Sequence, residues 1–262
     1  MHVPKIFAIL AGVYIVGQFL YIVYYAIGLV QFNPFVKLKP LTTLEKQVLT
    51  DNFPIYRKLP EVLKARCEER IKWFRSRKKF VFYGAVSRQE DIKLILSGSL
   101  VLMTLGLKNY KMRRSLMRVI VYPSQYYSRI SRRHHLGEYN PFFKTVVFSA
   151  EQLWEGFRIP NDNINLAMHE FAHALSYEMK RKGSWEAMKF RVGFREIHAL
   201  LAAPLFREQM AATGYFREYG MTNTQEFFSV AVENYVETPQ QFDQDFPELY
   251  GILKRMLKFE FR

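Results

Sequence analysis

The sequence predicts an α+β fold, a mostly helical domain with a small mixed sheet, preceded by one transmembrane helix. Three observations lead to this fold class. An uncharged apolar run fills residues 6–32. Two β-branched and aromatic runs, 117–123 and 144–149, are bounded by turn residues, as strands are. The C-terminal half has the apolar spacing of amphipathic helices.

Length and composition set the outer limits. A chain of 262 residues, 49% of them apolar, suits one or two domains and excludes global disorder. The only cysteine, Cys67, excludes an intramolecular disulfide and fits a reducing compartment. It lies in a charged run with no histidine nearby, so we interpret it as structural.

The formal charge of +14 would suit nucleic acid, anionic lipid or an acidic partner. The basic residues are scattered, however, and the densest cluster, residues 75–79, ends a predicted helix. Cations at that end oppose the negative pole of the helix dipole without any ligand. Because no zinc-finger, basic-zipper or RNA-binding signature accompanies them, nucleic-acid binding is not expected.

The N-terminus separates into a short tail, residues 1–5, and the apolar run, residues 6–32, bracketed by Lys5 and Lys37. Roughly 20 apolar residues cross a bilayer as a helix, so the run predicts a transmembrane helix embedded in lipid. A cleaved signal peptide is the alternative, since residues 26–28 are small-x-small. The apolar run is longer, however, than the ~7–15 residues that are usual for the apolar region of a signal peptide.

The charges beside the run predict its orientation. Three lysines follow it, Lys37, Lys39 and Lys46, against Lys5 and the amino terminus before it. By the positive-inside rule, we predict a single-pass membrane protein with its main domain in the cytoplasm. In a bacterium, the membrane would be the inner one.

Beyond the run, residues 33–40 form a linker with two prolines, and residues 41–262 form one domain. Residues 41–59 and 60–78 are each predicted to be a helix. The apolar stretch 94–107 is too short to cross a bilayer, which favours a buried core helix.

A motif that carries chemistry begins at Leu166, in "LAMHEFAHALSYE". His169 and His173 are four residues apart, so both lie on one face of a helix and can reach a common atom. H-E-x-x-H is the zinc-protease signature, in which Glu170 is the general base. Residues 161–163 offer Asn and Asp side chains as N-caps for this helix.

The predicted helix is apolar over most of its surface, which indicates burial. Its apolar residues are Ile164, Ala167, Met168, Phe171, Ala172 and Leu175. Two histidines and a carboxylate in a buried helix are costly unless a metal ion or hydrogen bonds satisfy them. The motif is therefore interpreted as a metal site and not as a chance match.

A catalytic zinc normally takes three protein ligands, so a third must come from elsewhere in the chain. The segment 218–239, "EYGMTNTQEFFSVAVENYVETP", supplies a candidate. Residues 222–224 offer caps for a second helix, on which Glu226, Ser229 and Glu233 share one stripe.

These motifs together resemble the family of Mlc titration factor A, the glucose-regulated zinc metallopeptidases related in their catalytic domain to anthrax lethal factor. The resemblance runs from about Leu41 to the C-terminus and includes "KKFVFYG", "RVIVYPSQY", "GEYNPFFKTVVFS" and "HEFAHAL". In relatives a Tyr stands seven residues before the ligand Glu, as Tyr219 stands before Glu226. The chain departs from the pattern after His173, where "ALSY" replaces a Lys-Leu-Asp stretch, and in its N-terminal span.

The resemblance implies a zincin fold of the gluzincin type for residues 41–262, with one Zn²⁺ per chain and a peptide or protein substrate. It implies three zinc ligands, His169, His173 and Glu226. Glu170 would be the general base, and Tyr219 would donate a hydrogen bond to the oxyanion. The strand 144–149 would be the edge strand that pairs with an extended peptide.

Two roles remain open for Glu233, which either orients a ligand histidine or forms a salt bridge with one of the many Arg and Lys residues. We predict that His198 is a core histidine and that His134 and His135 lie in a solvated loop. The resemblance also allows an alternative function, a regulatory binding protein that sequesters a transcription regulator or other partner without catalysis.

Overall fold

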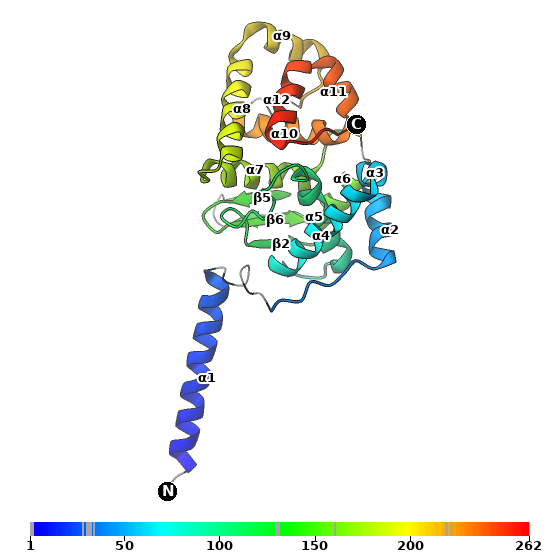
Figure 1. Ribbon diagram of the computed structural model, residues 1–262. Helices are drawn as coiled ribbons and strands as arrows, with labels where there is room; N and C mark the ends of the chain where they lie inside the picture. Colours follow the sequence, from blue (N-terminus) through cyan, green and yellow to red (C-terminus); the bar gives the residue numbers. More distant parts are fainter. Residues whose placement is uncertain are drawn as a thin grey trace. The chain divides into compact units, whose positions relative to one another are not determined.

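The computed structural model describes residues 3–27, 29, 33, 35–128, 132–159, 161–217, 220 and 222–261. The chain divides into two compact units, Met1–Leu38 and Lys39–Arg262. The first contains helix α1 (Val3–Ala26), shown in blue in Figure 1. Its segment Ile6–Tyr24 has a mean hydropathy of 2.2 and is nowhere buried.

Of the helices that the structure describes, α1 alone is long and apolar enough to cross a membrane, and a signal sequence would share these properties. The helix ends at Ala26, before the end of the predicted run at residue 32. Residues 28 and 30–32 lie outside the described part of the chain. The described helix therefore covers residues 6–26 of the run.

The second unit contains a four-stranded mixed sheet, in the order β1-β2-β6-β5. Its strands are β1 (Lys79–Phe82), β2 (Arg118–Tyr122), β5 (Gly137–Asn140) and β6 (Thr145–Ser149). The first two and β6 are parallel, while β5 runs antiparallel to β6. A two-stranded sheet, β3 (Tyr126–Ser128) and β4 (Arg133–His135), lies beyond β2 in the chain. A mostly helical α+β fold with a small mixed sheet is thus confirmed.

The prediction that residues 144–149 form the edge strand is wrong. Strand β6 lies inside the sheet, because β5 folds back on it with Gly137 opposite Phe148 and Asn140 opposite Thr145. Strand β5 is therefore the edge on this side. Its sequence, "GEYN", contains no β-branched residue, so the strand pattern does not reveal it.

The N-terminal half of the second unit contains several helices that pack on one another. They are α2 (Thr43–Asn52), α3 (Pro54–Lys58), α4 (Glu61–Arg77) and α5 (Gln89–Met103). The single helix predicted for residues 41–59 is divided, because Phe53 precedes a proline and adopts an extended conformation. Helix α5 is buried from Leu94 to Met103, which confirms the predicted core helix.

The C-terminal half is helical, as predicted. Its helices are α6 (Ala150–Arg158), α7 (Leu166–Lys180), α8 (Trp185–Ala202), α9 (Pro204–Thr213), α10 (Thr224–Glu237), α11 (Pro239–Asp245) and α12 (Pro247–Leu257). Helix α7 lies between the sheet and the C-terminal helices, and it contacts β5, β6, α8 and α10 (Figure 1).

The start of α7 differs from the prediction. The N-cap is Asn165, whose side-chain oxygen accepts from the backbone N–H of Met168 at 3.1 Å. Residues 161–163 form a turn before it, and Asn163 has a positive φ of 60°. The side chain of Asn165 also donates to Glu237 at 3.0 Å, so the cap joins α7 to α10. For α10 the N-cap is Asn223, one of the predicted candidates.

Replacing Asn165 with alanine removes this cap and one hydrogen bond to half-buried Glu237. We expect Asn165→Ala to lower the free energy of unfolding by about 2 kcal/mol in denaturant titrations of the purified chain. Asn161→Ala, at the position that the sequence suggests as a cap, is the control and should change it by less than about 0.5 kcal/mol. Equal effects of the two substitutions would contradict the assignment.

Candidate metal centre

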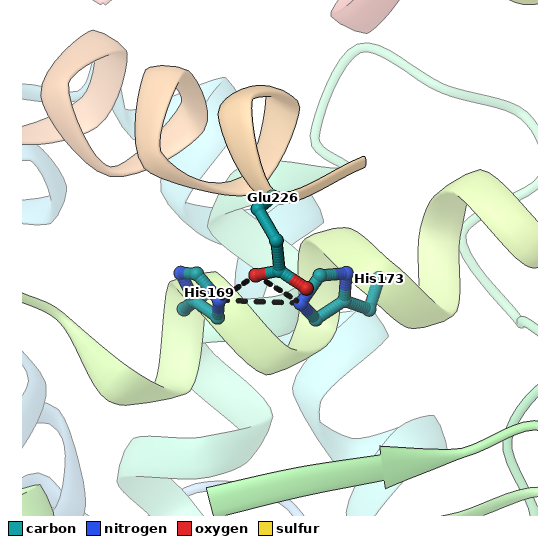
Figure 2. A group of neighbouring side chains, drawn as sticks. All are labelled: His169, His173 and Glu226. Carbon is teal, nitrogen blue, oxygen red and sulfur yellow. Dashed lines mark hydrogen bonds and ion pairs between the residues drawn. The ribbon is translucent and has the colours of Figure 1, made fainter. Parts of the chain in front are cut away.

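Three side chains from two helices, α7 and α10, lie close together. Figure 2 shows the imidazoles of His169 and His173 pointing from α7 toward the carboxylate of Glu226. Glu226 lies in the first turn of α10, where Asn223 caps the helix. Three donor atoms form a triangle. His169 Nε2 is 3.1 Å from Glu226 Oε2 and 3.2 Å from His173 Nε2, and His173 Nε2 is 3.4 Å from Glu226 Oε2.

This triangle fits a metal ion. Zinc bonds to His nitrogen and carboxylate oxygen are about 2.0–2.2 Å long, so tetrahedral ligand atoms lie about 3.3–3.6 Å apart. The measured sides are close to this edge length. Two ring nitrogens 3.2 Å apart also need a proton or a cation near them, because their lone pairs otherwise face each other. The chemistry of the donors, two imidazoles and one carboxylate, suits zinc.

A buried carboxylate contacts Nδ1 of His169, the ring nitrogen that faces away from Glu226. Glu233 is 1% exposed, and its Oε1 lies 2.8 Å from His169 Nδ1. The same carboxylate accepts from the backbone N–H of Asn165 at 2.6 Å and pairs with Arg217. Both roles considered for Glu233 are therefore present in the structure, the contact with a histidine and the salt bridge. This arrangement leaves Nε2 of His169 facing Glu226.

The outer nitrogen of His173 also has partners. Its Nδ1 lies 3.2 Å from the hydroxyl of Ser229, which is fully buried on α10, and 3.4 Å from the amide of Gln225. Gln225 in turn donates to Ser176 and accepts from Lys180. The sequence places Ser229 on the same stripe as Glu226 and Glu233, but it contains no signal for Gln225.

The charges of this cluster stabilise one another. Burial opposes protonation of His169, but hydrogen bonds to Glu226 and Glu233 outweigh it and raise the pKa of His169 to about 10. Burial would raise the pKa of Glu226, but hydrogen bonds to His169 and His173 hold it well below its usual range. Among the protein groups alone, the site therefore favours a cation between the imidazoles and the carboxylate.

Glu170 lies beside the three side chains and faces the edge strand. It is buried, and the backbone N–H of Tyr139 in β5 donates to it. Burial raises the pKa of Glu170, an effect that the two neighbouring histidines oppose. A Cβ on Gly137 would come within 3.1 Å of the Glu170 carboxylate and 2.7 Å of Leu166, so glycine allows β5 to approach this closely. Sequence reasoning missed Gly137.

A cleft of about 370 Å³ opens over these groups. We call it the metal cleft. It is lined by β5, by α7 from His169 to Lys180, and by Gln225 and Glu226 of α10. His135 also lines it, and lies in strand β4 instead of the predicted loop.

Two further sequence predictions have different outcomes. Tyr219 lies outside the described residues, so its predicted contact with the oxyanion stays a prediction. The prediction of a core histidine at 198 is wrong. His198 is exposed, its Nδ1 lies 2.9 Å from the hydroxyl of Thr224, and it is not part of the metal-binding group.

The contact between Glu233 and His169 predicts the effect of its removal. We expect Glu233→Gln to weaken zinc binding about 10- to 100-fold in a titration against a chelator, because an amide is a weaker acceptor for the ring N–H. Glu237→Gln, one turn along the same helix, is the matched control. Burial raises the pKa of Glu237 to about 7, and the residue contacts no metal-site side chain, so its affinity for zinc should stay unchanged. Unchanged affinity in both variants would refute the role of Glu233.

Comparisons with known proteins identify the family of this chain. A family model for the glucose-regulated metallopeptidases, M90, matches residues 31–258. An uncharacterised protein of Synechocystis sp., slr2042, is 21% identical over 239 residues, which cover 83% of this chain and 84% of the relative. Because the match extends over most of the chain and includes both metal-site helices, the resemblance seen in the motifs is confirmed. The chain belongs to the glucose-regulated metallopeptidase family M90.

Proposed function

We propose that this protein is a membrane-anchored, zinc-dependent peptidase with a gluzincin-like zincin domain. The observation that carries the proposal is the triangle of His169, His173 and Glu226 with the carboxylate of Glu170 beside it, all opening on one cleft. Membership of a metallopeptidase family supports a hydrolase that acts on peptides or proteins and uses a metal.

His169, His173 and Glu226 would hold one zinc ion per chain, as the spacing of their donor atoms allows. When bound, zinc lowers the pKa of a coordinated water and polarises the carbonyl of the peptide bond. Glu170 would take the proton of the attacking water and deliver it to the leaving amine. Tyr219 would donate its hydroxyl hydrogen to the oxyanion of the tetrahedral intermediate.

Strand β5, and not β6, is the candidate for binding an extended substrate. It forms the edge of the sheet and lines the metal cleft through Gly137, Glu138 and Tyr139. A peptide can add to such an edge by main-chain hydrogen bonds. Because Tyr139 donates its N–H to Glu170, the same strand would position both the substrate and the base.

The N-terminal unit supports a membrane anchor. Helix α1 contains the 19-residue segment Ile6–Tyr24, about 28 Å long at 1.5 Å per residue, which is close to the hydrocarbon thickness of a bilayer. We propose that residues 6–32 form the anchor region, residues 33–40 the linker and residues 41–262 the peptidase domain. The division of the chain after Leu38 supports this arrangement. The lysines after the anchor favour a cytoplasmic catalytic domain.

The base can be tested without disturbing the metal ligands. Glu170→Gln keeps the size of the side chain but cannot accept the proton, so peptidase activity should fall at least about a hundredfold. Zinc content, measured by elemental analysis, should stay near one ion per chain. Glu138→Gln alters another cleft carboxylate, one that accepts from Tyr126 and touches no zinc ligand, and should cost less than about tenfold in turnover.

The same measurement separates the peptidase from a regulatory binding protein on this scaffold. A binding protein would keep its cellular role in the Glu170→Gln variant. If the zinc-loaded wild type cleaves no peptide in a broad library, or if Glu170→Gln cleaves as fast as wild type, the peptidase proposal fails.

The proposed anchor predicts the behaviour of the chain in cells. The full-length protein should fractionate with membranes and resist a carbonate wash, and external protease should not reach its C-terminal domain in intact cells. Fractionation, N-terminal sequencing and protease protection test this. A mature N-terminus after the small-x-small sequence at 26–28 would instead identify a cleaved signal peptide.

A further inference from the structure

A second cavity shares the lining residue Lys180 with the metal cleft. This cavity, of about 460 Å³, is lined by Lys180, Met188, Phe190, Arg191, Phe194 and Arg195. We call it the basic pocket. Lys180, at the end of α7, lines both cavities. Among the residues that the structure describes, three cations and no acidic side chain line the basic pocket, whereas Glu138, Glu170 and Glu226 line the metal cleft.

The cations of the basic pocket are not neutralised within it. Among the described residues, no ion pair is formed by Lys180, Arg191 or Arg195, although Arg255 pairs with Glu196 farther along α8. Lys180 donates to the amide oxygen of Gln225 at 3.0 Å and lies 5.0 Å from the ring centre of Phe194. Arg191 donates to the carbonyls of Met179 and Lys182. Within the described part of the chain, the positive charge of the pocket therefore has no carboxylate beside it.

The position of the pocket sets its distance from the scissile bond. Lys180 follows His173 by seven residues, which is about 10 Å along a helix. An extended peptide advances about 3.3 Å per residue, so this distance corresponds to about three residues of a peptide bound in the cleft. Phe190, Phe194 and Met188 give it apolar walls, which strengthen the attraction between charges.

We propose that the basic pocket binds a carboxylate of the substrate, about three residues from the bond that is cleaved. This inference rests on the proposed peptidase function, since it assigns the class of substrate to the same cleft. The carboxylate is either an acidic side chain or the free C-terminus of the peptide. Lys180 and Arg195 would be residues that determine specificity, and the cavity would select peptides by charge.

Peptides that differ at one position test this. They carry Glu, Gln or Lys three residues before or after the cleaved bond, and a further pair ends at that position with a free or an amidated C-terminus. We expect the carboxylate peptides to bind zinc-loaded Glu170→Gln protein at least about fivefold more tightly than their neutral partners, as measured by fluorescence anisotropy. In wild type the same preference should appear in KM, with kcat little changed.

Substitutions in the basic pocket test whether the preference for carboxylate peptides arises there. Arg195→Glu should abolish or reverse it, and Lys180→Met should weaken it, with zinc content unchanged in both. Lys189→Glu is the control for net charge, because Lys189 lies on the same helix beside Trp185 and does not line the pocket. Equal binding of Glu and Gln peptides, or an equal change of the charge preference in all three variants, would contradict the proposed role of the basic pocket. Absence of any cleavage by wild type overturns the peptidase function instead, while the binding measurement still decides the role of the pocket.

Discussion

A buried carboxylate, that of Glu233, holds together the two helices that carry the metal-site residues. It contacts the ring of His169 and the backbone N–H of Asn165 on the α7 side, and it pairs with Arg217 in the segment that leads toward α10. A buried charge is tolerated only when several such partners satisfy it. Because these partners come from separate segments, the relative positions of His169 and Glu226 depend on Glu233 remaining in place.

The sheet places the proposed base and the cleft around this helix pair. Strand β5 folds back along β6, covers its outer side and becomes the edge of the sheet. Gly137 allows this edge to approach α7 closely enough for Tyr139 to donate to Glu170. One strand therefore lines the cleft and fixes the carboxylate beside the metal-site residues, so a bulkier residue at 137 would disturb both.

Helix α7 also connects two regions of opposite charge. Its first turns carry His169, Glu170 and His173 in a cleft with several carboxylates, and its last residue, Lys180, lies in a pocket lined by cations. Gln225 contacts both His173 and Lys180, so a hydrogen-bonded link runs from the metal site toward the basic pocket. In the proposed peptidase this arrangement would align a substrate by its charge at one end and by its scissile bond at the other.

Local patterns in the sequence were sufficient for the motif on α7, the stripe on α10, the apolar helix α1 and the buried helix α5, because each follows from the spacing of residues within a single element. The family resemblance, carried by the same motifs, was confirmed, and the geometry brings His169, His173 and Glu226 together. The tertiary structure decided which strand forms the edge, that Asn165 and not residues 161–163 caps α7, and that Lys180 shares a pocket with Arg195. These features depend on contacts between segments far apart in the chain, and no local periodicity encodes such contacts.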